Sequence, residues 1–138
     1  MITSPQPITV NRDGVGHRAT ICWRYDDRLW VVAIESAMFG TVEARANDAF
    51  EALCLVRDEL EPDGWRIGVT GAQVDVWPSG MARDQGAGLS AYRMTAGRVG
   101  GVVDTFEPVD PATVTTVADQ RAEADRLYEE IRRRAQNS

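Results

Sequence analysis

Residues 19–34 read ATICWRYDDRLWVVAI, and this stretch decides the fold class. Apolar and polar side chains alternate over 19–25, which is the period of a strand with one covered face. Residues 29–34 are apolar throughout, as is typical of a central strand covered on both faces. Asp26 and Asp27 make a short polar break between the two runs, so the stretch predicts a β-hairpin.

Two helices are predicted further along the chain. The first begins at Asn47 or Asp48, which can cap its N-terminus, and ends at the turn 62–64. Its polar positions are expected to form a solvated face, made up of Glu51, Arg57, Asp58, Glu59 and Glu61. The second helix begins at the capping pair Asp110–Pro111 and ends in an Arg triplet at 132–134, whose charge complements the helix dipole.

Strand periodicity between the helices predicts four more strands, at 65–70, 73–77, 89–95 and 102–106, with a long polar loop at 79–88 and a glycine turn at 97–101. The order β-β-α-β-β-β-β-α predicts a single α+β domain, with a mostly antiparallel sheet of about five to six strands and two helices packed on it. Pro and Gly residues in 1–16 predict an irregular N-terminal lead-in, which leaves 17–138 as the domain.

The composition excludes several chemistries. All 15 basic residues of the 138-residue chain are Arg, and the only His is His17. A P-loop and a pyridoxal phosphate site both need Lys, and a His-rich zinc site needs several imidazoles, so we expect no cofactor and no metal. Cys22 and Cys54 lie in apolar runs without CxxC spacing, which predicts buried, reduced thiols.

The charge balance bears on partners. The 21 acidic residues give a net charge of −6, which disfavours direct binding of nucleic acid and favours a basic protein partner. The start of the chain does not resemble a signal peptide, and no segment has the apolar length of a membrane span. We therefore expect a cytoplasmic protein without membrane contact, while its oligomeric state stays open.

The region 68–93, GVTGAQVDVWPSGMARDQGAGLSAYR, is where chemistry could reside. A phosphate cradle is disfavoured, because neither the P-loop nor the dinucleotide spacing is present. A small hydrolase or transferase could use Asp75, Ser79, Arg83 and Asp84, although a Ser nucleophile usually needs a His or Lys base. His17 lies far from this loop in the sequence.

A binding surface is the third interpretation of this region. Aromatic and Arg side chains dominate interface hot spots, and loops on a rigid sheet commonly carry function. The expected partner-binding residues are Asp75, Trp77, Ser79, Arg83, Asp84 and Tyr92. A purely structural interpretation also stays open, in which Asp75 accepts loop N–H groups, Arg83 pairs with Asp75 or Asp84, and the Tyr92 hydroxyl anchors the loop.

Two stretches carry a family resemblance: ELEPDGW at 59–65, and DVWPSGM at 75–81 followed by Arg83, two glycines and Tyr92. They resemble small uncharacterised actinobacterial and proteobacterial proteins associated with polymorphic-toxin loci. In such loci small acidic α+β proteins often serve as immunity proteins. The resemblance implies a non-catalytic domain that binds and neutralises a basic bacterial toxin, such as a nuclease. A small enzyme and a self-associating adaptor are the alternatives.

Overall fold

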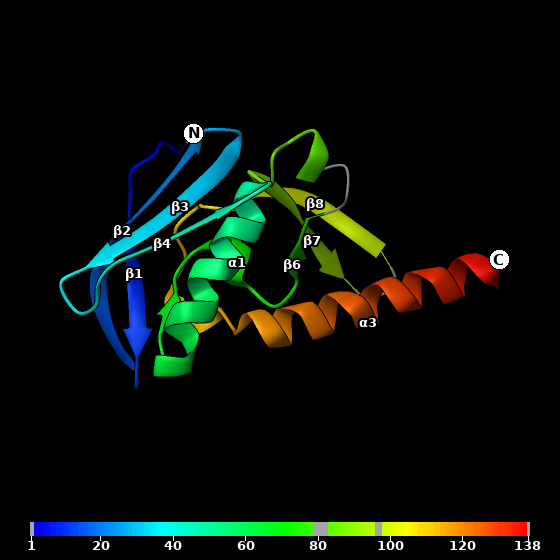
Figure 1. Ribbon diagram of the computed structural model, residues 1–138. Helices are drawn as coiled ribbons and strands as arrows, with labels where there is room; N and C mark the ends of the chain where they lie inside the picture. Colours follow the sequence, from blue (N-terminus) through cyan, green and yellow to red (C-terminus); the bar gives the residue numbers. More distant parts are fainter. Residues whose placement is uncertain (1, 79–82, 96–97, 138) are drawn as a thin grey trace.

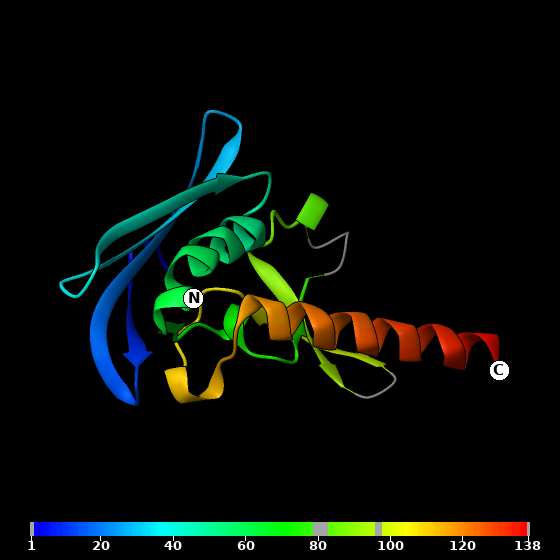
Figure 2. The same ribbon diagram turned by 60° about the horizontal axis from the view of Figure 1, so that its bottom comes forward.

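A computed structural model describes residues 2–78, 83–95 and 98–137, and it shows an α+β fold with two antiparallel sheets (Figure 1). The first sheet has the strand order β4-β3-β2-β1-β5. It curves around helix α1 (Ala49–Leu60), as Figure 2 shows. Its strands are β1 (Gln6–Arg12), β2 (Val15–Asp26), β3 (Leu29–Ser36), β4 (Gly40–Ala46) and β5 (Arg66–Ile67).

The second sheet has the order β6-β7-β8, with β6 (Val76–Trp77), β7 (Ser90–Thr95) and β8 (Arg98–Asp104). Helix α3 (Val117–Gln136) contacts β6 and β7, and its C-terminal half extends beyond the body of the fold (Figures 1 and 2). Short 3-10 helices span Glu61–Asp63, Thr70–Ala72 and Pro111–Thr113. The predicted α+β class is confirmed, although the strands divide between two sheets.

The predicted hairpin is confirmed as β2 and β3. They pair in antiparallel register from Thr20 opposite Glu35 to Asp26 opposite Leu29. Both turn residues, Asp27 and Arg28, have positive φ, as a two-residue hairpin turn that follows strand twist requires. Neighbouring side chains on β3 are fully buried on opposite faces, as the continuous apolar run predicts.

Two strands of the first sheet were not predicted from the sequence. The irregular lead-in expected over residues 1–16 is wrong, because β1 pairs with β2 along its whole length and buries Ile8 and Val10. Pro7 is tolerated there. The Thr9 carbonyl points toward β5, where it accepts from the Gly68 N–H, so the backbone of Pro7, two residues earlier, faces the same side. Strand β5 pairs only with Val10 and Asn11 and does not reach Pro7, so the missing N–H of Pro7 costs no hydrogen bond between strands. Strand β4, which begins at Gly40, is the second unpredicted strand.

The later elements are shorter or displaced relative to the sequence prediction. The strands expected at 65–70 and 73–77 reduce to β5 and β6. Of the glycine turn expected at 97–101, Gly100 and Gly101 lie inside β8, and Gly97 lies outside the described residues. Of the loop expected at 79–88, residues 83 and 84 are helical, and residues 79–82 lie outside the described residues. Asp110 caps only the short 3-10 helix, while Thr116 caps α3.

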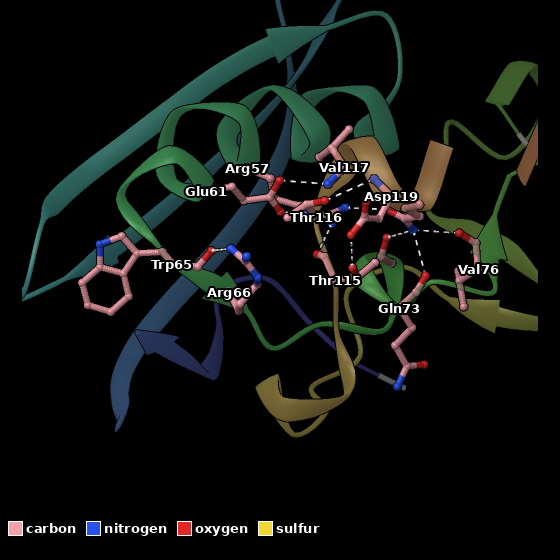
Figure 3. Close-up of polar contacts among 12 residues, drawn as sticks. Arg57, Glu61, Trp65, Arg66, Gln73, Val76, Thr115, Thr116, Val117 and Asp119 are labelled. Carbon is pink, nitrogen blue, oxygen red and sulfur yellow. Dashed lines mark hydrogen bonds and ion pairs between the residues drawn. The ribbon is translucent and has the colours of Figure 1, made fainter. Parts of the chain in front are cut away.

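The prediction of a solvated polar face on α1 is wrong for Arg57, because its side chain is completely buried. Its Nε bonds Glu61 Oε2 at 3.0 Å, its Nη1 bonds Gln120 Oε1 at 2.6 Å, and its Nη2 bonds the Thr115 carbonyl at 2.8 Å (Figure 3). The Glu61 side chain is only 8% exposed, so it also leaves the predicted face. A buried charge is tolerated when it is paired and hydrogen-bonded in this way.

The same network explains why α3 starts late. Glu61 Oε1 accepts from the backbone N–H of Val117 at 2.8 Å (Figure 3). The Gln120 amide donates to the carbonyls of Gly71 and Val76. The Thr115 N–H bonds the Ala72 carbonyl. Because both backbone groups of Thr115 have tertiary partners, the chain there does not continue as helix. We call the set Arg57, Glu61, Thr115 and Gln120 the buried network.

Candidate functional site

The aromatic members of the predicted site come together. Trp77 and Tyr92 are cross-strand partners on β6 and β7, and both are half-buried. The Trp77 ring meets Phe50 of α1 edge to face, with 5.2 Å between ring centroids. The Arg83 guanidinium lies 5.6 Å from the centroid of Trp77 and 5.4 Å from that of Phe50. Trp77, Arg83 and Tyr92 therefore lie in one region, while Ser79 lies outside the described residues.

Arg83 is held by two carboxylates of α1. Its Nη1 lies 3.3 Å from Asp48 Oδ2 and 3.4 Å from Glu51 Oε2, and its side chain is 24% exposed. Asp48 also caps α1 by accepting from the Glu51 N–H at 2.8 Å. The structure thus gives Arg83 different partners from Asp75 and Asp84, the two carboxylates that the sequence suggested.

The chain after Arg83 docks on the N-terminus of α1. The Ala87 carbonyl accepts from the Ala49 N–H at 2.7 Å, and the Gly88 carbonyl accepts from the Thr105 hydroxyl at 2.8 Å. Both Ala87 and Gly88 have positive φ. We call residues 83–88 the docking segment. It supplies one of the N-terminal donors of α1 with an acceptor and fixes the backbone that carries Arg83.

Asp75 belongs to a separate ion pair. Arg93 Nη1 lies 2.9 Å from Asp75 Oδ1, and Arg93 Nη2 bonds Gln73 Oε1 at 2.8 Å. Asp84 is exposed. Asp75 and Arg83 therefore have distinct ion-pair partners, and Ser79, the nucleophile of the hydrolase alternative, lies outside the described residues.

Helix α3 contributes residues that sequence reasoning did not include. The Arg121 guanidinium lies 5.8 Å from the centroid of Trp77, so two Arg side chains approach the same indole. The pKa of the Tyr128 hydroxyl is raised, mainly by burial. The Arg83 guanidinium opposes this shift, and Tyr92 adds to it. No spacing along the chain links α3 to the region 75–93, so only the tertiary fold could identify these residues. We call Trp77, Arg83, Tyr92 and Arg121 the aromatic–arginine site.

The two thiols are free, and they differ in burial. Cys54 is buried in α1, as predicted, whereas the prediction of a buried thiol is wrong for Cys22, which is only half-buried on β2. Burial raises the pKa of Cys54 from 9.0 to about 12, against the opposing charge of Arg57. A thiol that stays protonated is a poor nucleophile, so Cys54 fits the structural role predicted for it.

We expect a thiol-specific reagent at pH 8 to react with Cys22 in the native protein and to reach Cys54 only after denaturation. Labelling followed by peptide mass spectrometry measures this, and a Cys22→Ala variant is the control. Native labelling of Cys54 at the rate of Cys22 would contradict the assignment.

The same thiol makes stability depend on pH. Between pH 9 and about 12 the unfolded thiol loses its proton while the folded one keeps it, so the free energy of unfolding falls as the pH rises. The slope is at most about 1.4 kcal/mol per pH unit. Denaturant unfolding of Cys54→Ala beside the parent isolates this component, and an equal alkaline decline in both proteins would exclude it.

The comparisons with known proteins assign no family. No protein-family profile matches the chain, and a search of curated proteins returns no significant relative. Within residues 2–78, 83–95 and 98–137, no group of three or more His, Cys, Asp or Glu side chains could hold a metal ion. No helix in the same ranges is long and apolar enough to cross a membrane.

Proposed function

We propose that this protein is a non-catalytic binding domain that recognises another protein through the aromatic–arginine site. In its more specific form, the proposal is that the partner is a basic bacterial toxin, which this chain neutralises as an immunity protein. The observation that carries the binding role is the convergence of Arg83 and Arg121 on Trp77, beside Tyr92.

The geometry of the site favours recognition over proton transfer. The Arg83 guanidinium is paired to α1 and lies over two rings, so its orientation is fixed before a partner arrives. Rigid aromatic and Arg anchors lose little conformational entropy on binding and are the types most enriched in interface hot spots. Asp75 is similarly held by Arg93.

The overall negative charge of the chain, and not the charge of the site itself, supports a basic partner. Asp58, Glu59 and Asp63 are exposed around the C-terminal end of α1 and form no ion pair with any described residue. Together with the net charge of −6, such acidic groups would accelerate association with a positively charged protein through long-range attraction. The resemblance to proteins of polymorphic-toxin loci supports the toxin as that partner.

The test uses the protein encoded by the adjoining open reading frame, co-expressed with this chain. We expect a complex that co-purifies and a rescue of bacterial growth. Trp77→Ala should weaken the complex about 30-fold or more, because hot-spot aromatics contribute about 2 kcal/mol or more. Binding is measured by isothermal titration calorimetry.

Two further variants control for damage to the fold. Arg121→Ala removes an exposed side chain of the site and should also weaken binding. Tyr25 of β2 is 62% exposed and lies outside the site, so Tyr25→Ala should leave binding unchanged. If no complex forms and no toxicity is relieved, the immunity role is wrong. If a complex forms but tolerates both Trp77→Ala and Arg121→Ala, the binding site lies elsewhere.

A further inference from the structure

Strand β4 is an open edge of the five-stranded sheet. It pairs with β3 along all seven residues, from Gly40 opposite Ser36 to Ala46 opposite Trp30, without a bulge. Among the described residues, no strand pairs with its other side. Its side chains are exposed or half-buried throughout. A long regular edge of this kind presents unpaired N–H and C=O groups to any strand that can align with it.

The other outer strands of the two sheets are protected. Strands β5 and β6 have two residues each, and the open part of β1, beside β5, contains Pro7, which lacks an N–H. In β8 the register shifts opposite Arg93, where a Cβ at Gly100 would lie 2.4 Å from the Arg93 carbonyl oxygen. Short strands, Pro and bulges are devices that block edge pairing. Strand β4 carries none of these three devices, and its edge is guarded instead by the charged side chains of Glu43 and Arg45.

Charge selects what can pair with β4. On the outer face of the sheet it exposes Glu43 and Arg45, on either side of Ala44. When two copies of β4 run antiparallel about a two-fold axis at Ala44, Glu43 of each copy lies opposite Arg45 of the other. A two-fold axis at Glu43 or at Arg45 instead places like charges opposite each other. Only the register centred on Ala44 therefore forms two favourable cross-strand pairs.

The outer face of each copy is already arranged for this pairing. Glu43 Oε1 lies 2.9 Å from Arg24 Nη2, and Arg45 Nη2 lies 3.2 Å from Asp26 Oδ2. Val31 of β3 pairs with Arg24 of β2 on one side and with Arg45 of β4 on the other, and its side chain is fully buried. The neighbouring ion pairs restrain the edge side chains, so pairing would continue a row of alternating charges from one copy into the next.

We propose that this protein forms a homodimer through antiparallel pairing of β4 with β4 of a second copy, centred on Ala44. The two five-stranded sheets then become one ten-stranded sheet, with both α1 helices on the same side. The aromatic–arginine site lies on the other sheet, the docking segment and α3, so each copy keeps its own. One strand pair buries little surface, so we expect a weak dimer that forms only at high protein concentration.

The decisive experiment mixes two variants, each of which opposes self-pairing. Glu43→Arg places Arg opposite Arg in its own homodimer, and Arg45→Glu places Glu opposite Glu. We expect each variant alone to dimerise at least about tenfold more weakly than the parent, because two attractive pairs become repulsive. An equimolar mixture should restore the dimer as a heterodimer, since both pairs are again of opposite charge.

Sedimentation equilibrium from micromolar to millimolar concentration measures the mass against the 15.2 kDa chain. Glu35→Arg is the matched control, with the same charge change on the central strand β3, and it should dimerise like the parent. Circular dichroism confirms that every variant is folded. A parent that stays at 15.2 kDa overturns the proposal, as do single variants that dimerise normally or a mixture that gains nothing.

Discussion

Replacing Arg57 with Met is expected to cost about 3–5 kcal/mol of unfolding free energy, the usual range for removing one partner of a buried ion pair. The variant leaves the nearly buried Glu61 carboxylate without its guanidinium and Gln120 Oε1 without its donor. Met fills much of the volume, so the loss reflects the stranded polar groups more than a cavity. Urea denaturation followed by far-UV circular dichroism measures the change.

The control for Arg57 is Arg126→Met on the outer face of α3, where the ion pair to Glu123 is exposed to solvent. Surface pairs contribute little, so this variant should unfold with the parent. The double variant Arg57→Met/Gln120→Met should cost less than the sum of the two single changes, because both residues act in one network. Strict additivity, or a small effect of Arg57→Met, would show that the buried network does not hold α3 to α1.

Gly88→Ala is expected to destabilise the protein by roughly 2–5 kcal/mol, from left-handed strain together with overpacking. Gly88 has a φ of +74°, and an added Cβ would lie 2.6 Å from the backbone nitrogen of Phe50 and 2.7 Å from Asp48 Oδ1. The first atom is backbone and the second is held as the cap of α1, so the docking segment must move away from the helix. Thermal and urea unfolding both report the loss.

Gly14→Ala separates the two causes. Gly14 lies in the turn between β1 and β2 and has nearly the same φ, +77°, but a Cβ added there would meet nothing within 4 Å. The substitution should therefore show only the left-handed strain of about 1–2 kcal/mol. Equal costs at the two glycines would mean that the docking segment is not pressed against α1.

The sequence predicted those parts of the fold whose signals are local. The β2–β3 hairpin follows from alternation around a polar turn, and the start of α1 follows from the capping residue Asp48. Strand β4 was not predicted because Ala44 and Ala46 are weak apolar markers and Glu43 favours helices. Strand β1 was not predicted because Pro7 suggested a loop. In the structure the missing N–H of Pro7 faces the side of β1 that β5 does not cover at this position.

The candidate site was predictable only in part, for a related reason. Trp77 and Tyr92 belong to neighbouring strands, so their local sequence context was enough to place them together. The partners of Arg83 lie more than thirty residues earlier in the chain, on α1. Arg57 resembled a surface residue because the acceptors that permit its burial arrive from residues 115–120. Charge pairing over such separations leaves no periodic signal in one sequence.

The buried network also has a consequence for synthesis of the chain. Arg57 is translated well before Thr115 and Gln120, which accept its hydrogen bonds. While those residues are still within the ribosome, the Arg57 side chain must stay in water, and α1 cannot settle fully against the first sheet. Packed elements generally fold together, and the contacts between α1 and α3 can form only after α3 emerges. A ribosome stalled before α3 would therefore present an incompletely packed chain to chaperones and proteases.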